Sequence, residues 1–212
     1  MLGDNSSFLL NGVLTTVGLT ILGFVGALLI GTIVAVFRVS PITPLRVVGT
    51  VYVEFFRNVP LLTLLILIVF GLPDIGMLIP LFWCGVLGLV LAGSAFICET
   101  VRSGINTISV GQSEAARALG MSFGTQLRLI ILPQAFRNML PVLLTQSIIL
   151  FQDVSLVSLL NVTDFVGAAV KIAQRDSRIV EMYLFVAIVY FILCYTLSLM
   201  VKRLQHRIAI VH

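Results

Sequence analysis

The stretch that determines the fold class is FLLNGVLTTVGLTILGFVGALLIGTIVAVF, Phe8–Phe37, which holds no charged residue. A helix needs about 20 predominantly apolar residues to cross the hydrocarbon core of a bilayer. The stretch exceeds this length, so it predicts a membrane-spanning helix. It is also too long for the apolar core of a cleavable signal peptide, which covers about 7–15 residues after a basic start.

The composition of the whole chain agrees with a membrane protein. Of its 212 residues, 59% are hydrophobic and 10% are charged, against about 45–50% and 25% in soluble domains. The mean hydropathy is +1.14. So few charges leave too little polar surface for a soluble globule, and the sequence indicates an all-α integral membrane protein. The net charge of +4 comes from bases scattered between apolar spans, without the basic runs typical of nucleic-acid binding.

Four more apolar segments have the length of a membrane span. They cover residues 47–72, 79–98, 138–160 and 182–201. The sequence contains no internal repeat and no low-complexity linker. We therefore expect residues 1–212 to form a single transmembrane domain with five helices.

Basic residues are distributed unevenly between the two sides of these spans. With the N-terminus outside, ten arginines and lysines lie inside and three outside, as the positive-inside rule requires. The inside set is Arg38, Arg46, Arg57, Arg102, Arg117, Arg128, Arg137, Lys202, Arg203 and Arg207, and the outside set is Lys171, Arg175 and Arg178. The sequence predicts an outer N-terminus, a cytoplasmic C-terminus and a cytoplasmic connection between the third and fourth spans.

The outer connection 161–181 has the pattern of a short amphipathic helix near Asp164–Gln174. Either Asp164 or Thr163 can cap it, because a short side-chain oxygen accepts hydrogen bonds from the free amides of a first helical turn. A plain surface loop is the alternative interpretation.

The cytoplasmic connection, about residues 103–136, predicts two short helices joined by a glycine. Ser109 and Gln112 have the spacing of a capping box at the first helix. Gly120 can adopt the left-handed conformation that ends a helix at little cost. Ser122 can cap the second helix, which we expect to end near Pro133 because proline disrupts a helix interior.

The first of these helices is predicted to present Ala115, Ala116 and Leu119 on one face. Small side chains allow the backbone of a partner to approach closely, which favours docking on another protein. The alternative is an amphipathic segment that rests on the lipid surface. The small apolar face and the scarcity of bases favour the protein partner.

The spacing of this connection resembles the EAA motif of ATP-binding cassette importer permeases. Its fixed positions are occupied here by Glu114, Ala115, Ala116, Gly120, Ile130, Leu132 and Pro133. The resemblance implies a type I importer fold of five transmembrane helices. It also implies that this segment, Leu119 included, is a coupling helix seated in a groove of a cytoplasmic ATPase.

Further stretches resemble permeases of the polar amino-acid subfamily. YVEFFRNVPLL (52–62) is similar to the segment entering the second span, and LPQAFRNMLP (132–141) and LFQDVSLVSLL (150–160) to the fourth. LLTQSIILFQDVSLV (143–157) and RDSRIVEMYLF (175–185) are most similar to glutamate/aspartate importer permeases. The resemblance therefore implies a bacterial inner-membrane importer for a polar amino acid, with glutamate or aspartate as the first expectation.

Such an importer implies several partners. These are a cytoplasmic ATPase dimer, a second permease subunit that is the same chain or a similar one, an extracytoplasmic amino-acid-binding protein and the surrounding lipid. The chain has no G-x-x-x-x-G-K-[ST] phosphate loop, so we expect ATP to be bound by the ATPase and this chain not to be an enzyme. Its histidines, His206 and His212, both lie in the tail, so no metal site or catalytic triad is expected.

Polar residues inside spans are costly and usually face the interior of a helix bundle. The candidates for a substrate path are Arg57, Ser94, Thr145, Gln146, Gln152 and Asp153. Glu99 lies near the cytoplasmic end of the third span, and Glu54 has the spacing to pair with Arg57. For each candidate taken singly, a hydrogen bond between helices is an alternative role.

The predicted function is a permease subunit that translocates a polar amino acid. The alternatives are cargo of another polar or basic kind, or an ion-gradient-driven secondary transporter. The missing internal repeat argues against the second alternative.

Overall fold

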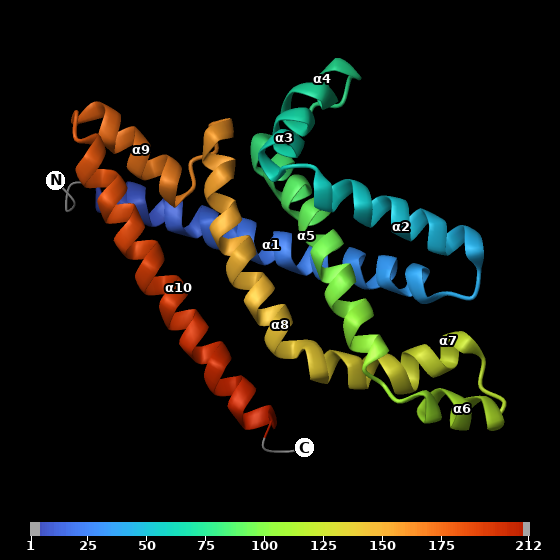
Figure 1. The fold of residues 1–212 in the computed structure, drawn as a ribbon. Coiled ribbons are helices and arrows are strands. Elements are labelled where there is room, and N and C mark those ends of the chain that lie inside the picture. Colours follow the sequence, from blue (N-terminus) through green and yellow to red (C-terminus); the bar gives the residue numbers. More distant parts are fainter. Residues whose placement is uncertain (1–4, 210–212) are drawn as a thin grey trace.

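The computed structural model describes residues 5–209, and the side chains of residues 206–209 are not described, so both histidines lie outside the described side chains. The described part is helical and contains no strand (Figure 1). The α-helices are α1 (Ser6–Val39), α2 (Thr43–Asn58), α3 (Leu61–Ile66), α4 (Leu72–Asp74), α5 (Leu81–Asn106), α6 (Val110–Ala118), α7 (Phe123–Gln126), α8 (Leu132–Asp153), α9 (Phe165–Arg175) and α10 (Ile179–Ala209). Two π-helical turns, η1 (Leu67–Gly71) and η2 (Leu127–Ile131), and a 3₁₀ segment, η3 (Val154–Leu160), continue neighbouring helices.

Four helical segments are each long and apolar enough to cross a membrane. They are Ser6–Val39, Leu81–Asn106, Phe123–Leu160 and Ile179–Gln205. The pair Thr43–Asn58 and Leu61–Asp74 provides a fifth span if the two helices are taken together. The all-α membrane fold predicted from the sequence is therefore confirmed, although its second span is not a continuous helix.

The second span is broken where the sequence predicts one helix over 47–72. Its two halves meet at an angle of 102°. Pro60 has no backbone N–H to donate and disfavours a helical conformation in the residue before it. Val59 is accordingly extended, with φ −89° and ψ 125°. The segment is apolar on both sides of the break, so its hydropathy does not distinguish a bent span from a continuous helix.

The predicted helix end near Pro133 is also wrong, because the chain continues without interruption from α7 through η2 into α8. A proline inside an α-helix loses one hydrogen bond, and its ring clashes with a carbonyl of the preceding turn. The wider π turn relieves this clash, since it changes the position of that carbonyl. The same arrangement recurs in η1, which ends two residues before Pro73, as η2 does before Pro133.

Helices α1 and α5 pack closely through glycines. A Cβ atom added to Gly26 would lie 2.6 Å from Val90, and one added to Gly31 would lie 2.7 Å from the Ser94 carbonyl oxygen. Small residues allow helices to approach closely in membranes, where apolar surface alone gives no preference for helix contact over lipid. This contact fixes α5 along α1.

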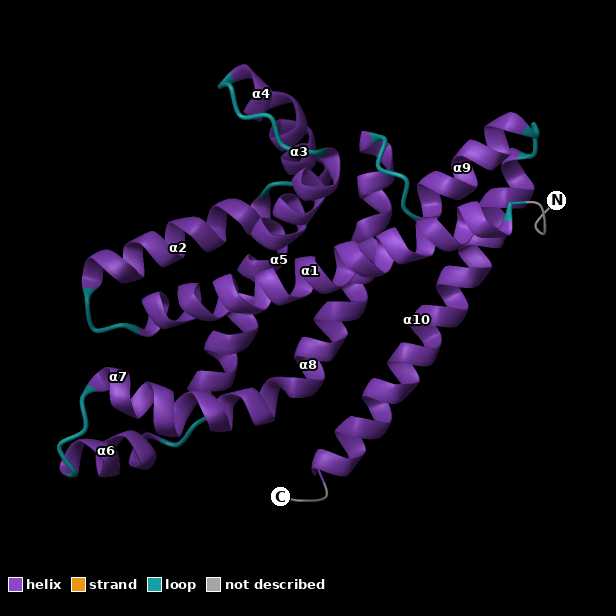
Figure 2. Cartoon of the chain, turned by 180° about the vertical axis from the view of Figure 1, so that it is seen from behind, coloured by secondary structure: helices purple, strands orange, loops and turns teal. Residues whose placement is uncertain are grey.

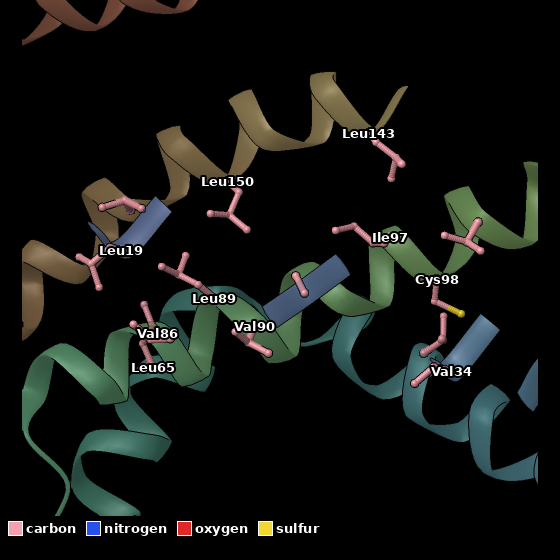
Figure 3. Close-up of a cluster of buried hydrophobic side chains, with 14 of the residues drawn as sticks. Leu19, Val34, Leu65, Val86, Leu89, Val90, Ile97, Cys98, Leu143 and Leu150 are labelled. Carbon is pink, nitrogen blue, oxygen red and sulfur yellow. The ribbon is translucent and has the colours of Figure 1, made fainter. Parts of the chain in front are cut away.

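The main apolar core surrounds α5. Figure 3 shows Leu89 and Ile97 of α5 with Leu143 and Leu150 of α8 on one side and Leu65 of α3 on the other. The helix is thus held between α1, α3 and α8, and its polar side chains have defined positions.

The helix predicted near Asp164–Gln174 is observed as α9. Asp164 caps it, with its Oδ1 accepting from the Gly167 amide at 2.8 Å, and the Phe165 amide donates to Thr16 Oγ1 of α1 at 3.0 Å. Asp164 is completely buried, and its Oδ2 has no partner. Burial raises the pKa of Asp164 to about 6, because it outweighs the hydrogen bonds from the backbone that lower it.

Candidate functional site

The structure places α6 and α7 at one end of the molecule and α9 at the opposite end (Figure 2). Gly120, between α6 and α7, has a φ of +73°, as predicted for a left-handed turn. The Ser122 hydroxyl accepts from the Thr125 amide at 3.3 Å and caps α7, which confirms that prediction. The capping box is not formed, because the Ser109 side chain makes no cap bond and the Gln112 amide donates to the Ser109 carbonyl instead.

The predicted common face of α6 is only partly present. Glu114 and Ala115 are exposed, and Leu119 exposes 81% of its surface, but Ala116 is buried. Ala116 faces inward, and its carbonyl accepts from the Met121 amide at 3.1 Å. Apart from Ala116 and the half-buried Ser113, the residues of α6 are exposed, so the surface available to a partner runs along this helix and includes Leu119 at its end.

The remaining residues of the EAA spacing lie away from this tip. Ile130 belongs to η2, and its carbonyl accepts from Gln134 Nε2 at 2.9 Å. Leu132 packs against the main core, and Pro133 begins α8. These positions connect the α6–α7 hairpin to the span that follows.

A cavity of about 530 Å³ lies between the end of α2, α5 and α8. It brings together three of the predicted path residues, Arg57, Gln146 and Asp153. The rest of its wall is mainly apolar and includes Phe56, Val59, Pro60, Leu61, Leu89, Ala92, Gly93, Phe96, Ile97, Ile149 and Leu150. A small number of polar groups in an apolar cavity of this size is typical of a ligand site.

The other three predicted path residues lie elsewhere. The Ser94 hydroxyl is buried 2.7 Å from the Tyr52 hydroxyl and joins α5 to α2. Thr145 donates to the Pro141 carbonyl at 3.1 Å, and Gln152 approaches Cys194 Sγ of α10 at 3.5 Å. These are contacts within and between helices, which is the alternative role that the sequence left open.

Arg57 forms an ion pair with Glu99 and not with Glu54, the partner predicted from the sequence. Arg57 Nη1 lies 3.4 Å from Glu99 Oε1 on α5, whereas Glu54 accepts from Asn58. The Arg57 guanidinium also lies 5.7 Å from the centre of the Phe96 ring, at the wall of the cavity.

Glu99 is the centre of a charge cluster that the sequence analysis missed. Arg38 of α1 forms a short ion pair with it, and Arg102 contributes two bonds, at 2.9 and 3.1 Å. Arg38 lies 61 positions from Glu99 in the sequence, so no local spacing shows that contact. The available signal was Glu99 itself, because a carboxylate inside a span needs cationic partners.

Asp153 has no such partner. No hydrogen bond or ion pair of its carboxylate is found within residues 5–205, and its side chain faces the cavity. The cavity therefore presents one cation and one anion, Arg57 and Asp153, with the Gln146 amide as a neutral polar group. Among the described side chains, no group of three or more His, Cys, Asp or Glu residues could hold a metal ion.

Comparisons with known proteins give a consistent result. Residues 27–210 match the family described as binding-protein-dependent transport system inner membrane component. The chain is 43% identical to the glutamate/aspartate import permease protein GltK of Escherichia coli O6:H1, covering 95% of this chain and 94% of that protein. It is 35% identical to the probable glutamine ABC transporter permease protein GlnM of Bacillus subtilis, covering 98% and 96%. A crystal structure of an amino acid ABC transporter with histidines matches with a TM-score of 0.88 and 34% identity, over 97% of this chain and 96% of that one.

Proposed function

The chain belongs to the family of binding-protein-dependent transport system inner membrane components, and from this premise we propose that it is the permease subunit of an ATP-driven importer of a polar amino acid. The first candidates for the cargo are glutamate and aspartate. The observation that supports this proposal most directly is the cavity in which Arg57, Gln146 and Asp153 meet.

The two charges of the cavity complement an amino acid. Every amino acid carries a carboxylate and an ammonium group, which Arg57 and Asp153 can bind respectively. A guanidinium can donate two parallel hydrogen bonds to a carboxylate. The Gln146 amide can donate to or accept from a polar side chain of the cargo, and Phe96 and Ile149 provide apolar contacts.

The surrounding charge favours an acidic cargo. Three arginines, Arg38, Arg57 and Arg102, converge on the single carboxylate of Glu99, which leaves a local excess of positive charge beside the cavity. This excess stabilises a second carboxylate on the cargo. A neutral polar amino acid such as glutamine is the second candidate, because the Gln146 amide can pair with a side-chain amide and one relative is a probable glutamine permease.

In this proposal residues 1–212 act as one transmembrane domain in the bacterial inner membrane, with the N-terminus outside and α6 in the cytoplasm. The tip of α6 docks on an ATPase dimer, which binds the ATP. A second permease, the same chain or a similar one, completes the route, and a binding protein delivers cargo at the side of α9. The exposed Leu119 at the tip of α6 supports the docking, because an apolar side chain so exposed in an aqueous loop gains from burial in a groove.

Uptake by the purified importer in proteoliposomes tests this proposal. With the binding protein outside and ATP inside, we expect uptake of labelled L-glutamate or L-aspartate that stops without ATP. Unlabelled glutamine and arginine added as competitors define the specificity. Uptake driven by an ion gradient without ATP would indicate a secondary transporter, and uptake of arginine alone would refute the acidic cargo.

A further inference from the structure

Arg57 and Glu99 meet at the boundary between two cavities. A second cavity of about 400 Å³ is lined by Glu99, Thr100, Ser103, Thr107 and Asn138, among others. Both cavities lie between α5 and α8, which run antiparallel, since Gly93 approaches Leu150 and Gly104 approaches Met139. The first cavity uses residues 89–97 of α5, and the second uses residues 99–104 of α5 and Thr107 just after it, so the two lie in series along one crevice.

The three arginines around Glu99 are held unequally. Arg38 forms the shortest contact, and its side chain is only 11% exposed. Arg102 forms two hydrogen bonds to Oε2 from the same helix. Arg57 is the most distant, at 3.4 Å; its side chain is 41% exposed, and it lines the first cavity. Of the three partners, Arg57 is therefore the one that another anion can take from Glu99 most easily.

We propose that the Arg57–Glu99 pair is a cargo-operated switch, an inference that rests on the proposed function. The carboxylate of an amino acid in the first cavity replaces Glu99 as the partner of Arg57. Glu99 remains paired with Arg38 and Arg102, so no charge is left without a partner by the exchange. Glu99 is thus a specificity and positioning residue that competes with cargo for Arg57.

The exchange also changes how α2 is held. The Arg57–Glu99 pair ties the end of α2 to α5, and the break at Val59–Pro60 follows directly and lines the same cavity. Once Arg57 binds cargo, this tie is released and the tie between Tyr52 and Ser94 remains. Cargo binding therefore loosens the bent span at its break.

Binding of labelled L-glutamate to the purified permease–ATPase complex tests the switch, because competition predicts opposite effects for two neighbouring substitutions. Glu99→Gln removes the competitor and should raise the affinity, by about two- to fivefold for a partly exposed pair. Arg102→Gln removes a competing partner of Glu99, so Glu99 holds Arg57 more firmly and the affinity should fall. Arg102→Lys, which keeps the charge, should restore it, and Ser103→Ala, an uncharged change in the second cavity, serves as the control.

A structural role of the cluster would instead lower the affinity in both Glu99→Gln and Arg102→Gln. That result, or an unchanged affinity in Glu99→Gln, overturns the switch. If Glu99→Gln does not assemble, Glu99→Asp replaces it. The shorter carboxylate holds Arg57 less firmly, so the affinity should rise while Arg102→Gln lowers it, and a fall in both variants overturns the switch. A parent complex that binds neither glutamate, aspartate nor glutamine contradicts the proposed function itself.

Discussion

The Tyr52 and Ser94 hydroxyls lie 2.7 Å apart and join the first half of the broken span to α5 across 42 positions of sequence. The Ser94 hydroxyl also approaches the Leu91 carbonyl, at 2.9 Å. Ser94 can donate to that carbonyl and accept from the phenol. Both groups are thereby satisfied inside the protein, and the position of α2 beside the cavity is fixed.

Tyr52→Phe should lower stability modestly. The change removes the phenol oxygen but leaves Ser94 with its backbone partner, so we expect a loss of about 1 kcal/mol in the free energy of unfolding. Thermal unfolding of the detergent-solubilised chain measures it. Tyr183→Phe is the matched control, because Tyr183 is 51% exposed. Equal melting temperatures of the two variants would contradict a stabilising hydrogen bond between Tyr52 and Ser94.

Gly31→Ala should destabilise the α1–α5 contact. The added methyl group would lie 2.7 Å from the Ser94 carbonyl oxygen, so the helices must separate, and overpacking of this kind costs about 1–3 kcal/mol. Gly18→Ala is the control, since its nearest neighbour lies 3.6 Å away. Thermal unfolding compares the two, and the close contact is refuted if both variants melt like the parent.

Asp164 should make stability depend on pH. Its pKa is about 6 when folded and about 3.9 when unfolded, so the folded protein binds this proton more tightly. The contribution to stability is greatest below pH about 4 and is lost as the pH rises to about 6, a change on the order of 3 kcal/mol. Asp164→Asn keeps a capping oxygen and should flatten this part of the curve of melting temperature against pH. If the melting temperature of Asp164→Asn depends on pH as it does in the parent, the raised pKa of the buried Asp164 carboxyl is contradicted.

Leu119→Glu should weaken the association with the ATPase without affecting the fold. Leu119 is 81% exposed at the tip of α6, so its replacement removes no internal packing. We expect the melting temperature of the isolated chain to stay constant and the amount of co-purifying ATPase to fall. Gly111→Ala is the control on the same helix, because a Cβ there meets nothing within 4 Å. Normal co-purification with Leu119→Glu would argue against docking at this tip.

Much of the fold was predictable because long apolar runs and single charges mark spans and connections. The points where a helix breaks or continues at a proline were not predictable from the sequence. Val59–Pro60 bends a span by 102°, whereas Pro133 is accommodated by a π turn, and only the surrounding packing distinguishes these two prolines. For the site, the search for polar residues inside spans identified Arg57, Gln146 and Asp153, which line the cavity. The Glu99 cluster depends on contacts between α1, α2 and α5, which no local pattern contains.

Binding of the cargo ammonium by Asp153 is tested most directly by the uptake of labelled L-glutamate by the reconstituted importer carrying Asp153→Asn. Loss of a charged partner for the cargo ammonium costs about 1.5–3 kcal/mol, so we predict an apparent affinity lower by about tenfold to a hundredfold. Assembly with the ATPase should be unchanged, and Thr145→Ala, which alters a residue bonded to its own helix, should behave like the parent. If the Asp153→Asn variant instead takes up glutamate with the same kinetics as the parent, the placement of the cargo in this cavity is contradicted.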